Sequence, residues 1–309
     1  MSHTFVRKDR WQTEFLPFLN KIKPFFNIHV FFFNYKKSNS VLLAGFLSVL
    51  KGNKPLTRKV FGMTKQYDVI VIGSGPAAMA AMYPIKESGR SVAVVEGAHF
   101  GGTCPNTGCD PKKILYAKSE AAWQAKQLAG KGVRGDVSFH WEEAMTEKEK
   151  YTSVVPDAME QKMNEAGIDT YHGFAQFIDE TTIKVSGQTL VAERFLLATG
   201  AKPKTLDFPG AELVQTHEHF LAQKTLPETI AFLGGGYISF ECAHLAARAG
   251  ATVHLIVSGD QVLKAFNQAH VKELVRLSEQ LGITFHWNWD VEELEKKARG
   301  VLIKAGPIS

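Results

Sequence analysis

Cysteine is scarce in this sequence, and long apolar segments are missing from it. Only three of the 309 residues are cysteines, which is too few for a small secreted fold held together by disulfides. Within residues 1–62 the longest apolar run, Val41–Leu50, is about half the roughly 20 residues that a helix needs to cross a bilayer. No signal peptide with a cleavage site opens the chain. These absences argue against a secreted or membrane-spanning protein, and we expect a cytoplasmic one.

The basic charge of the chain is concentrated in its first 62 residues. Residues 1–62 contain 11 lysines and arginines against two acidic residues, whereas the rest contains 25 basic and 29 acidic residues. The acidic remainder gives no reason to expect a nucleic-acid partner. Residues 1–62 also hold 10 of the 21 phenylalanines without a helical or strand period. We expect a non-native or disordered extension, with peripheral membrane contact or an extra ordered element as alternatives.

A regular pattern begins at residue 68. A β-branched strand over 68–72 runs into the segment GSGP at 73–76, followed by a small-residue helix and a second strand over 91–95. This order predicts a parallel βαβ unit. Gly73 and Gly75 allow a tight turn and close approach of a pyrophosphate, and Ala78 lets the helix pack closely. Glu96 ends the second strand, where an acid binds ribose hydroxyls, so we predict a dinucleotide site rather than an empty glycine turn.

The same arrangement recurs later in the chain. A strand over 229–233 leads into three glycines at 234–236, a helix over about 237–249 and a strand over 252–257. We therefore predict an α/β protein with two Rossmann-like dinucleotide-binding domains. The expected domains are residues 63–205 and residues 206–309, of which the second is incomplete.

Two of the three cysteines lie in one distinctive segment. Residues 101–113 read GGTCPNTGCDPKK, which resembles the redox-active segment of class I pyridine nucleotide–disulfide oxidoreductases, the family of glutathione, lipoamide and mercuric reductases. The resemblance implies a redox-active Cys104–Cys109 disulfide. Residues five apart in a regular helix have Cα atoms roughly 8–9 Å apart, and a disulfide needs about 4.4–6.8 Å. The turn must therefore be distorted, which Pro105 and Gly108 allow. The alternative, a zinc site, lacks a second pair of ligands, so we predict no metal.

The resemblance also implies the cofactors and the roles of the site residues. It predicts FAD on the first domain, a nicotinamide dinucleotide on the second, and a small-molecule disulfide as substrate. Lys112 would lie beside the flavin and pair with Glu241, and Cys109 would lie nearer the flavin than Cys104. The cofactor-binding residues expected for FAD are Gly73, Ser74, Gly75, Pro76, Ala77, Ala78, Glu96, Gly102, Thr103, Lys112, Thr199 and Gly200.

The second domain is expected to prefer NADPH over NADH. Its second strand ends at Ser258 without the acid that would bind a 2′-hydroxyl, and Lys264 lies where NADPH-using relatives carry a basic residue. Tyr237 matches the tyrosine that covers the nicotinamide pocket, with simple packing as the alternative. The residues expected to contact the nicotinamide dinucleotide are Gly234, Gly236, Tyr237, Ile238, Ser258 and Lys264.

Two departures from the family pattern qualify the resemblance. It covers about residues 66–304, whereas relatives continue into a dimerisation domain that completes their homodimeric active site. A catalytically incompetent FAD-binding fragment is therefore the alternative to an active reductase. Asp110 stands where the family usually has an apolar residue, and we expect its charge to raise the pKa of the neighbouring Cys109 thiol.

Overall fold

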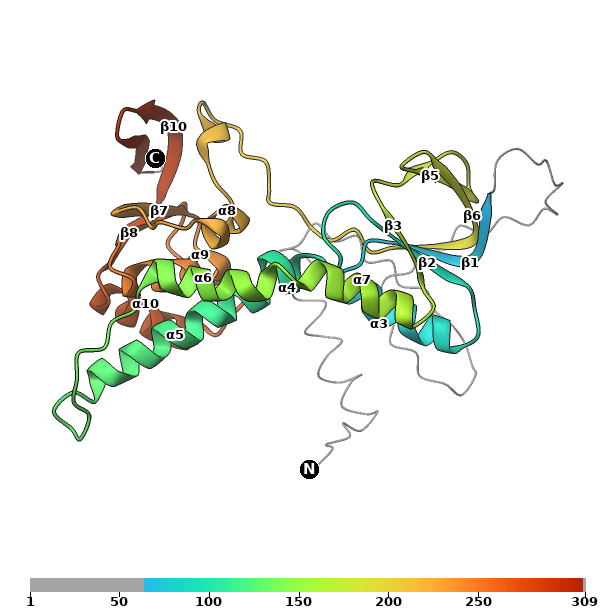
Figure 1. The fold of residues 1–309 in the computed structure, drawn as a ribbon. Helices are drawn as coiled ribbons and strands as arrows, with labels where there is room; N and C mark the ends of the chain where they lie inside the picture. Colours follow the sequence, from blue (N-terminus) through green and yellow to red (C-terminus); the bar gives the residue numbers. More distant parts are fainter. Residues whose placement is uncertain (1–63, 308–309) are drawn as a thin grey trace.

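The computed structural model describes residues 64–307, so the prediction made for residues 1–62 concerns residues outside the described part of the chain. Two sheets lie at opposite ends of the molecule, and helices run between them (Figure 1). Within residues 64–307, every helix is too short or too polar to cross a membrane.

The first sheet has six strands in the order β3-β2-β1-β6-β5-β4. The first four strands of this order are parallel, and β5 and β4 continue the sheet as antiparallel strands. Helices α3 (Pro76–Glu87) and α7 (Val155–Glu165) share an apolar cluster with one face of the sheet. The strands are β1 (Lys65–Ile72), β2 (Val92–Glu96), β3 (Asp169–His172), β4 (Gln176–Phe177), β5 (Thr182–Val185) and β6 (Gln188–Leu197).

The second sheet has three parallel strands in the order β7-β8-β9. Both sheets thus use the strand order 3-2-1 of a Rossmann-like unit, which confirms the predicted α/β fold. A charged antiparallel hairpin follows, to which the sequence analysis assigned no structure. The elements are α8 (His217–Ala222), β7 (Thr229–Leu233), α9 (Tyr237–Arg248), β8 (Thr252–Val257), α10 (Gln268–Gln280), β9 (Ile283–Trp287), β10 (Trp289–Lys297) and β11 (Gly300–Pro307), after the short 3-10 helix η3 (Ala211–Leu213).

Helices from the first half of the chain pack against the second sheet. Helices α5 (Cys109–Gln127) and α6 (Trp141–Thr152) lie beside α9 in Figure 1, and α4 (Thr103–Thr107) lies near the middle of the molecule. Leu115 and Trp141 share one buried cluster with Leu245 and Leu255. The domain boundary predicted at residue 205 separates Leu115 and Trp141 from Leu245 and Leu255 in the sequence. In the structure, this apolar core contains residues from both sides of that boundary.

An ion pair also joins α5 to α9. Arg248 Nη1 donates to Glu120 Oε2 over 2.6 Å, and the Arg248 side chain is only 15% exposed. Its guanidinium lies 5.2 Å from the ring centroid of Trp123. A largely buried, stacked guanidinium of this kind fixes orientation as well as charge. The start of α5 is therefore held in a defined position relative to the second sheet.

Candidate functional site

The first glycine loop lies where β1, β2 and β6 end. Gly73 N donates to Val95 O, and Ala198 N donates to Ile72 O, each over 2.8 Å. Gly73 has φ +99°, and a Cβ there would lie 2.2 Å from the Ala198 carbonyl oxygen. Only glycine fits this turn. Thr199 and Gly200, which follow β6, are exposed at the same edge.

Glu96 reaches back from the end of β2 to this loop. Its Oε2 accepts hydrogen bonds from Ser74 N over 3.0 Å and from Ser74 Oγ over 2.5 Å. Its Oε1 accepts one from Ala98 N over 2.8 Å. Ser74 is fully buried, and its Oγ also accepts a bond from Gly101 N. These bonds hold the carboxylate beside the glycine loop, with lone pairs left for hydroxyl groups of a ligand.

The glycine loop meets the cysteine segment through two glycines. A Cβ on Gly102, whose φ is +66°, would lie 2.7 Å from Gly75 Cα. Gly75 is also the N-cap of α3, whose first residues Pro76 and Ala77 are exposed. The unpaired N–H groups at such a helix start bind anions such as a pyrophosphate. The residues present therefore fit a dinucleotide phosphate beside Gly102 and the exposed Thr103.

The cysteine segment is a helix interrupted at Gly108. This residue separates α4 from α5 with φ −132° and ψ −106°, so the distorted turn that the spacing predicts is present. Asn106 stabilises the turn by donating to the carbonyls of Phe100 and Gly102 over 2.9 and 2.8 Å. Cys104 and Cys109 are free thiols, and Cys104 is the less exposed of the two. Burial, a hydrogen bond with Cys109 and the charge of Asp110 raise the pKa of Cys104 to about 11.

Asp110 has a partner that the sequence analysis did not identify. Tyr151, near the end of α6, donates its hydroxyl to Asp110 Oδ2 over 2.9 Å. This hydrogen bond raises the pKa of Tyr151, and burial and the negative charges of Asp110 and Cys104 act in the same direction. Asp110 is itself a sign of such a partner, because the resemblance predicts an apolar residue at this position. The sequence does not show which residue the partner is, because Tyr151 lies 41 residues away.

Lys112 and Glu241 form an ion pair across the two halves of the chain. Lys112 Nζ lies 2.5 Å from Glu241 Oε2, with side chains 24% and 43% exposed. This is the pair that the resemblance implies. The neighbouring Cys242 is buried, and burial with the charge of Glu241 raises its pKa to about 12. Cys242 therefore packs as a small apolar residue.

The second glycine loop opens α9. Gly236 is the N-cap of α9, and a Cβ there would meet no atom within 4 Å. Leu263 N donates to Gly235 O over 2.9 Å, which brings the segment after β8 to the loop. Ser258 and Lys264 are exposed on that segment, while Tyr237 and Ile238 are exposed at the start of α9. The structure thus places these predicted residues around one loop.

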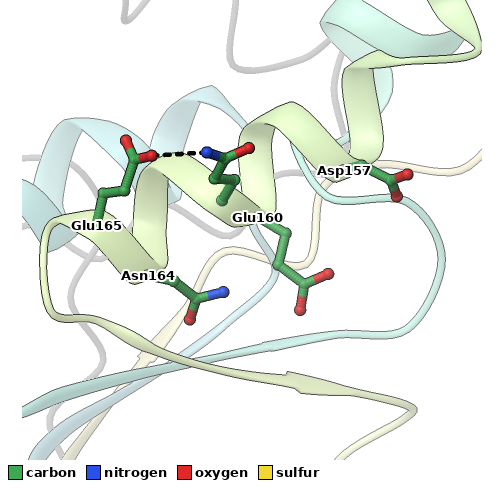
Figure 2. A pocket seen from close by; sticks show the side chains of 5 residues that line it. Asp157, Glu160, Asn164 and Glu165 are labelled. Atoms are coloured by element: carbon green, nitrogen blue, oxygen red, sulfur yellow. Dashed lines mark hydrogen bonds between the residues drawn. The ribbon is translucent and has the colours of Figure 1, made fainter.

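A separate hollow lies on α7, apart from both glycine loops. Figure 2 shows that Asp157, Glu160 and Glu165 line it, with Gln161 donating to Glu165 over 2.7 Å. Glu160 accepts a bond from Thr170 over 2.7 Å. Within residues 64–307, no three His, Cys, Asp or Glu side chains are arranged so that they could hold a metal ion. The hollow contains none of the residues predicted for chemistry.

Comparison with known proteins identifies the family. Residues 67–306 match the pyridine nucleotide-disulphide oxidoreductase family. A glutathione reductase of Nostoc is 32% identical over 225 residues, which are 72% of this chain and 48% of the relative. A mercuric reductase of Staphylococcus aureus is 31% identical over 239 residues, which are 75% of this chain and 43% of the relative.

The solved structure of the HOCl-induced flavoprotein disulfide reductase RclA from Escherichia coli, as a Cu(II) complex, shares the fold. The TM-score is 0.68 at 23% identity, and the match covers 78% of this chain and 53% of that one. The chain spans about half the length of the curated relatives that it matches. With most of its residues matched, the chain belongs to the pyridine nucleotide-disulphide oxidoreductase family, whose members are enzymes.

Proposed function

We propose that this chain is the dinucleotide-binding and cysteine-bearing part of an FAD-dependent NAD(P)H disulfide oxidoreductase. The close approach of Gly102 to Gly75 carries the proposal. Because of this contact, the segment that holds both reactive cysteines begins at the loop that is shaped for a dinucleotide phosphate. A pair of cysteines with only a packing role would not require a position next to the first glycine loop.

The residues that would hold FAD lie along the first glycine loop. Backbone groups of residues 73–78 would bind the pyrophosphate, and Glu96 would accept hydrogen bonds from the ribose hydroxyls. Thr199 and Gly200 follow β6 at the same edge of the sheet, and Lys112 follows the cysteine pair. When bound, FAD would supply the two-electron carrier between a reduced nicotinamide and the disulfide.

The cysteines would perform the exchange with substrate. The Cys104 thiolate attacks one sulfur of a substrate disulfide, forms a mixed disulfide and releases the first thiolate. The Cys109 thiolate then attacks Cys104 Sγ, releases the second thiolate and forms the Cys104–Cys109 disulfide. The two protons lost by the cysteines pass to the two released thiolates. Lys112, held by Glu241, supplies a positive charge one turn beyond Cys109.

We propose NADPH as the hydride donor, bound at the second glycine loop. Gly234 and Gly236 would admit the pyrophosphate, and Tyr237 and Ile238 lie at the start of α9 beside it. Ser258 presents no carboxylate to repel a 2′-phosphate, and Lys264 offers it a cation. We also propose a cytoplasmic location and the homodimeric assembly that the resemblance implies for the whole protein.

Thiol counting with a flavin spectrum tests the proposal. The native, oxidised protein should show the absorbance of bound flavin. After denaturation it should show one titratable thiol, from Cys242. Treatment with anaerobic NADPH before denaturation should raise the count to three. In the Cys104→Ser variant, the count should be two before and after NADPH. Bound flavin with one thiol in both states would instead indicate an FAD-binding fragment that does not turn over. Colourless protein that takes up no added FAD would contradict both functions.

A further inference from the structure

Asp110 places a negative charge next to Cys109, the partner of the cysteine that would meet the substrate. It follows Cys109 directly in the first turn of α5, and its carboxylate is half-buried. The hydrogen bond from Tyr151 fixes its direction, because α6 packs against α5 and carries Tyr151 to within 2.9 Å. The charge acts on Cys104, where it opposes ionisation of the thiol.

Among residues 64–307, the charged groups that act most strongly on Cys104 are Cys109 and Asp110, and both oppose its ionisation. Tyr151 faces Asp110 from α6. From α8, Glu218 lies 3.5 Å from the Thr107 hydroxyl and adds a second acid beside α4. Lys112, in the next turn of α5, is paired with Glu241, so its charge is partly neutralised by that carboxylate. A helix N-terminus normally favours anions, and Asp110 counteracts that preference at the start of α5.

We propose that Asp110, positioned by Tyr151, makes the cysteine pair select neutral or cationic disulfides and disfavour disulfides that carry carboxylates near the sulfurs. The inference rests on the proposed function, since it names the class of disulfide that the pair would reduce. The physical reason is that the attacked sulfur must come within bonding distance of Cys104. Charges on the substrate then lie within one Debye length of the Asp110 carboxylate, where screening is incomplete.

The test uses the full chain after chemical reduction by a phosphine, so it needs neither flavin nor NADPH. Three probes differ in charge: cystamine is cationic, bis(2-hydroxyethyl) disulfide is neutral, and 3,3′-dithiodipropionate is anionic. Mass spectrometry follows oxidation of Cys104, while Cys242 is buried and remains a thiol. The measured quantity is the rate with cystamine divided by the rate with dithiodipropionate. Intrinsic reactivities of the probes cancel when this ratio is compared between variants.

The Asp110→Asn variant should lower the ratio about five-fold, as expected for loss of one charge at close range. Asparagine still accepts the Tyr151 hydrogen bond, so the local geometry is kept. A change in thiol ionisation alone alters all three rates together and leaves the ratio unchanged. The matched control is Glu142→Gln, an exposed acid on α6 roughly 13 Å along the helix from Tyr151. It should leave the ratio unaltered.

Two outcomes would overturn the inference. One is an Asp110→Asn ratio equal to that of the unaltered chain, and the other is an equal fall in Glu142→Gln. If Asp110→Asn fails to fold, the same rate ratio is measured on the unaltered chain at several salt concentrations, and its dependence on salt tests the inference. Raising salt from roughly 0.01 M to 1 M shortens the Debye length from about 30 to 3 Å, and the ratio should fall several-fold. A ratio independent of salt would contradict a charge effect. Failure of flavin binding would affect none of these measurements.

Discussion

The two glycine loops have the same local architecture but different surroundings. In the first, the strand after the helix ends in Glu96, which is bonded to Ser74, and the cysteine segment packs on the loop at Gly75. In the second, the equivalent strand ends at Val257 and is followed by the exposed Ser258, and the loop is open at Gly236. The scaffold is therefore the same in both places, and under our proposal the residues at its rim determine which dinucleotide binds.

The two sites should also differ in how they tolerate a side chain at Gly102 and at Gly236. A side chain added at Gly236 meets only open space, whereas one added at Gly102 meets the backbone of the first loop. A small side chain at Gly236 should therefore affect ligand binding alone. Changes where the first loop meets the cysteine segment should affect binding and stability together.

The largest expected effect is that of Gly102→Ala. Its Cβ would lie 2.7 Å from Gly75 Cα, and φ is +66°, so strain and overlap act together. We expect a loss of about 3 kcal/mol in the free energy of unfolding, measured in urea, and loss of flavin binding.

Gly130→Ala is the matched control for Gly102→Ala. Gly130 has φ +74° and no atom within 4 Å of an added Cβ, so it carries the backbone strain without the overlap. It should lose only about 1 kcal/mol and retain flavin. Equal losses in the two variants would show that the contact between Gly102 and Gly75 contributes nothing.

The Ser258→Glu variant should make the second loop resemble the first. A carboxylate at the end of β8 would repel a 2′-phosphate and accept bonds from a 2′-hydroxyl. We expect the ratio of NADPH to NADH affinity to fall at least about ten-fold, a difference of roughly 1.4 kcal/mol. Titration of the purified chain with each dinucleotide measures this. Ser153→Glu adds the same charge on the exposed end of α6 and should leave the ratio unchanged.

The sequence predicts both loops well because their elements are defined locally. The β-branched strands β1, β2, β7 and β8 end within a residue or two of their predicted ends, because buried parallel strands have continuous apolar runs. Helix α6 and the β10–β11 hairpin were not predicted. Their segments are rich in charge, and Trp141 and Leu294 become buried only through distant partners. The Tyr151–Asp110 bond is likewise a tertiary contact without a local pattern.

Glu120→Gln tests how the two halves are held together. The Arg248 guanidinium lowers the pKa of Glu120, so the pair stabilises the fold above the unfolded pKa, about 4.3. We expect a loss of about 1–2 kcal/mol near neutral pH, because the pair is largely buried. The difference between the unaltered chain and the variant should shrink as the pH falls through the lowered pKa of Glu120. Urea unfolding at several pH values measures it, and a difference independent of pH would contradict an ionic contribution.

Glu241→Gln should have the smallest effect on stability. It tests whether the Lys112–Glu241 pair has a different role from the Arg248–Glu120 pair, which also joins α5 to α9. Its pair with Lys112 is more exposed than the pair of Glu120 with Arg248, so solvent screens most of its energy. We expect a loss of at most about 0.5 kcal/mol in urea unfolding. Lys112 would then be released beside the cysteine pair, and reduction of Cys104–Cys109 by NADPH should slow more than stability changes. If Glu241→Gln instead destabilises as much as Glu120→Gln, the Lys112 pair is a structural contact and its proximity to the cysteines has no functional meaning.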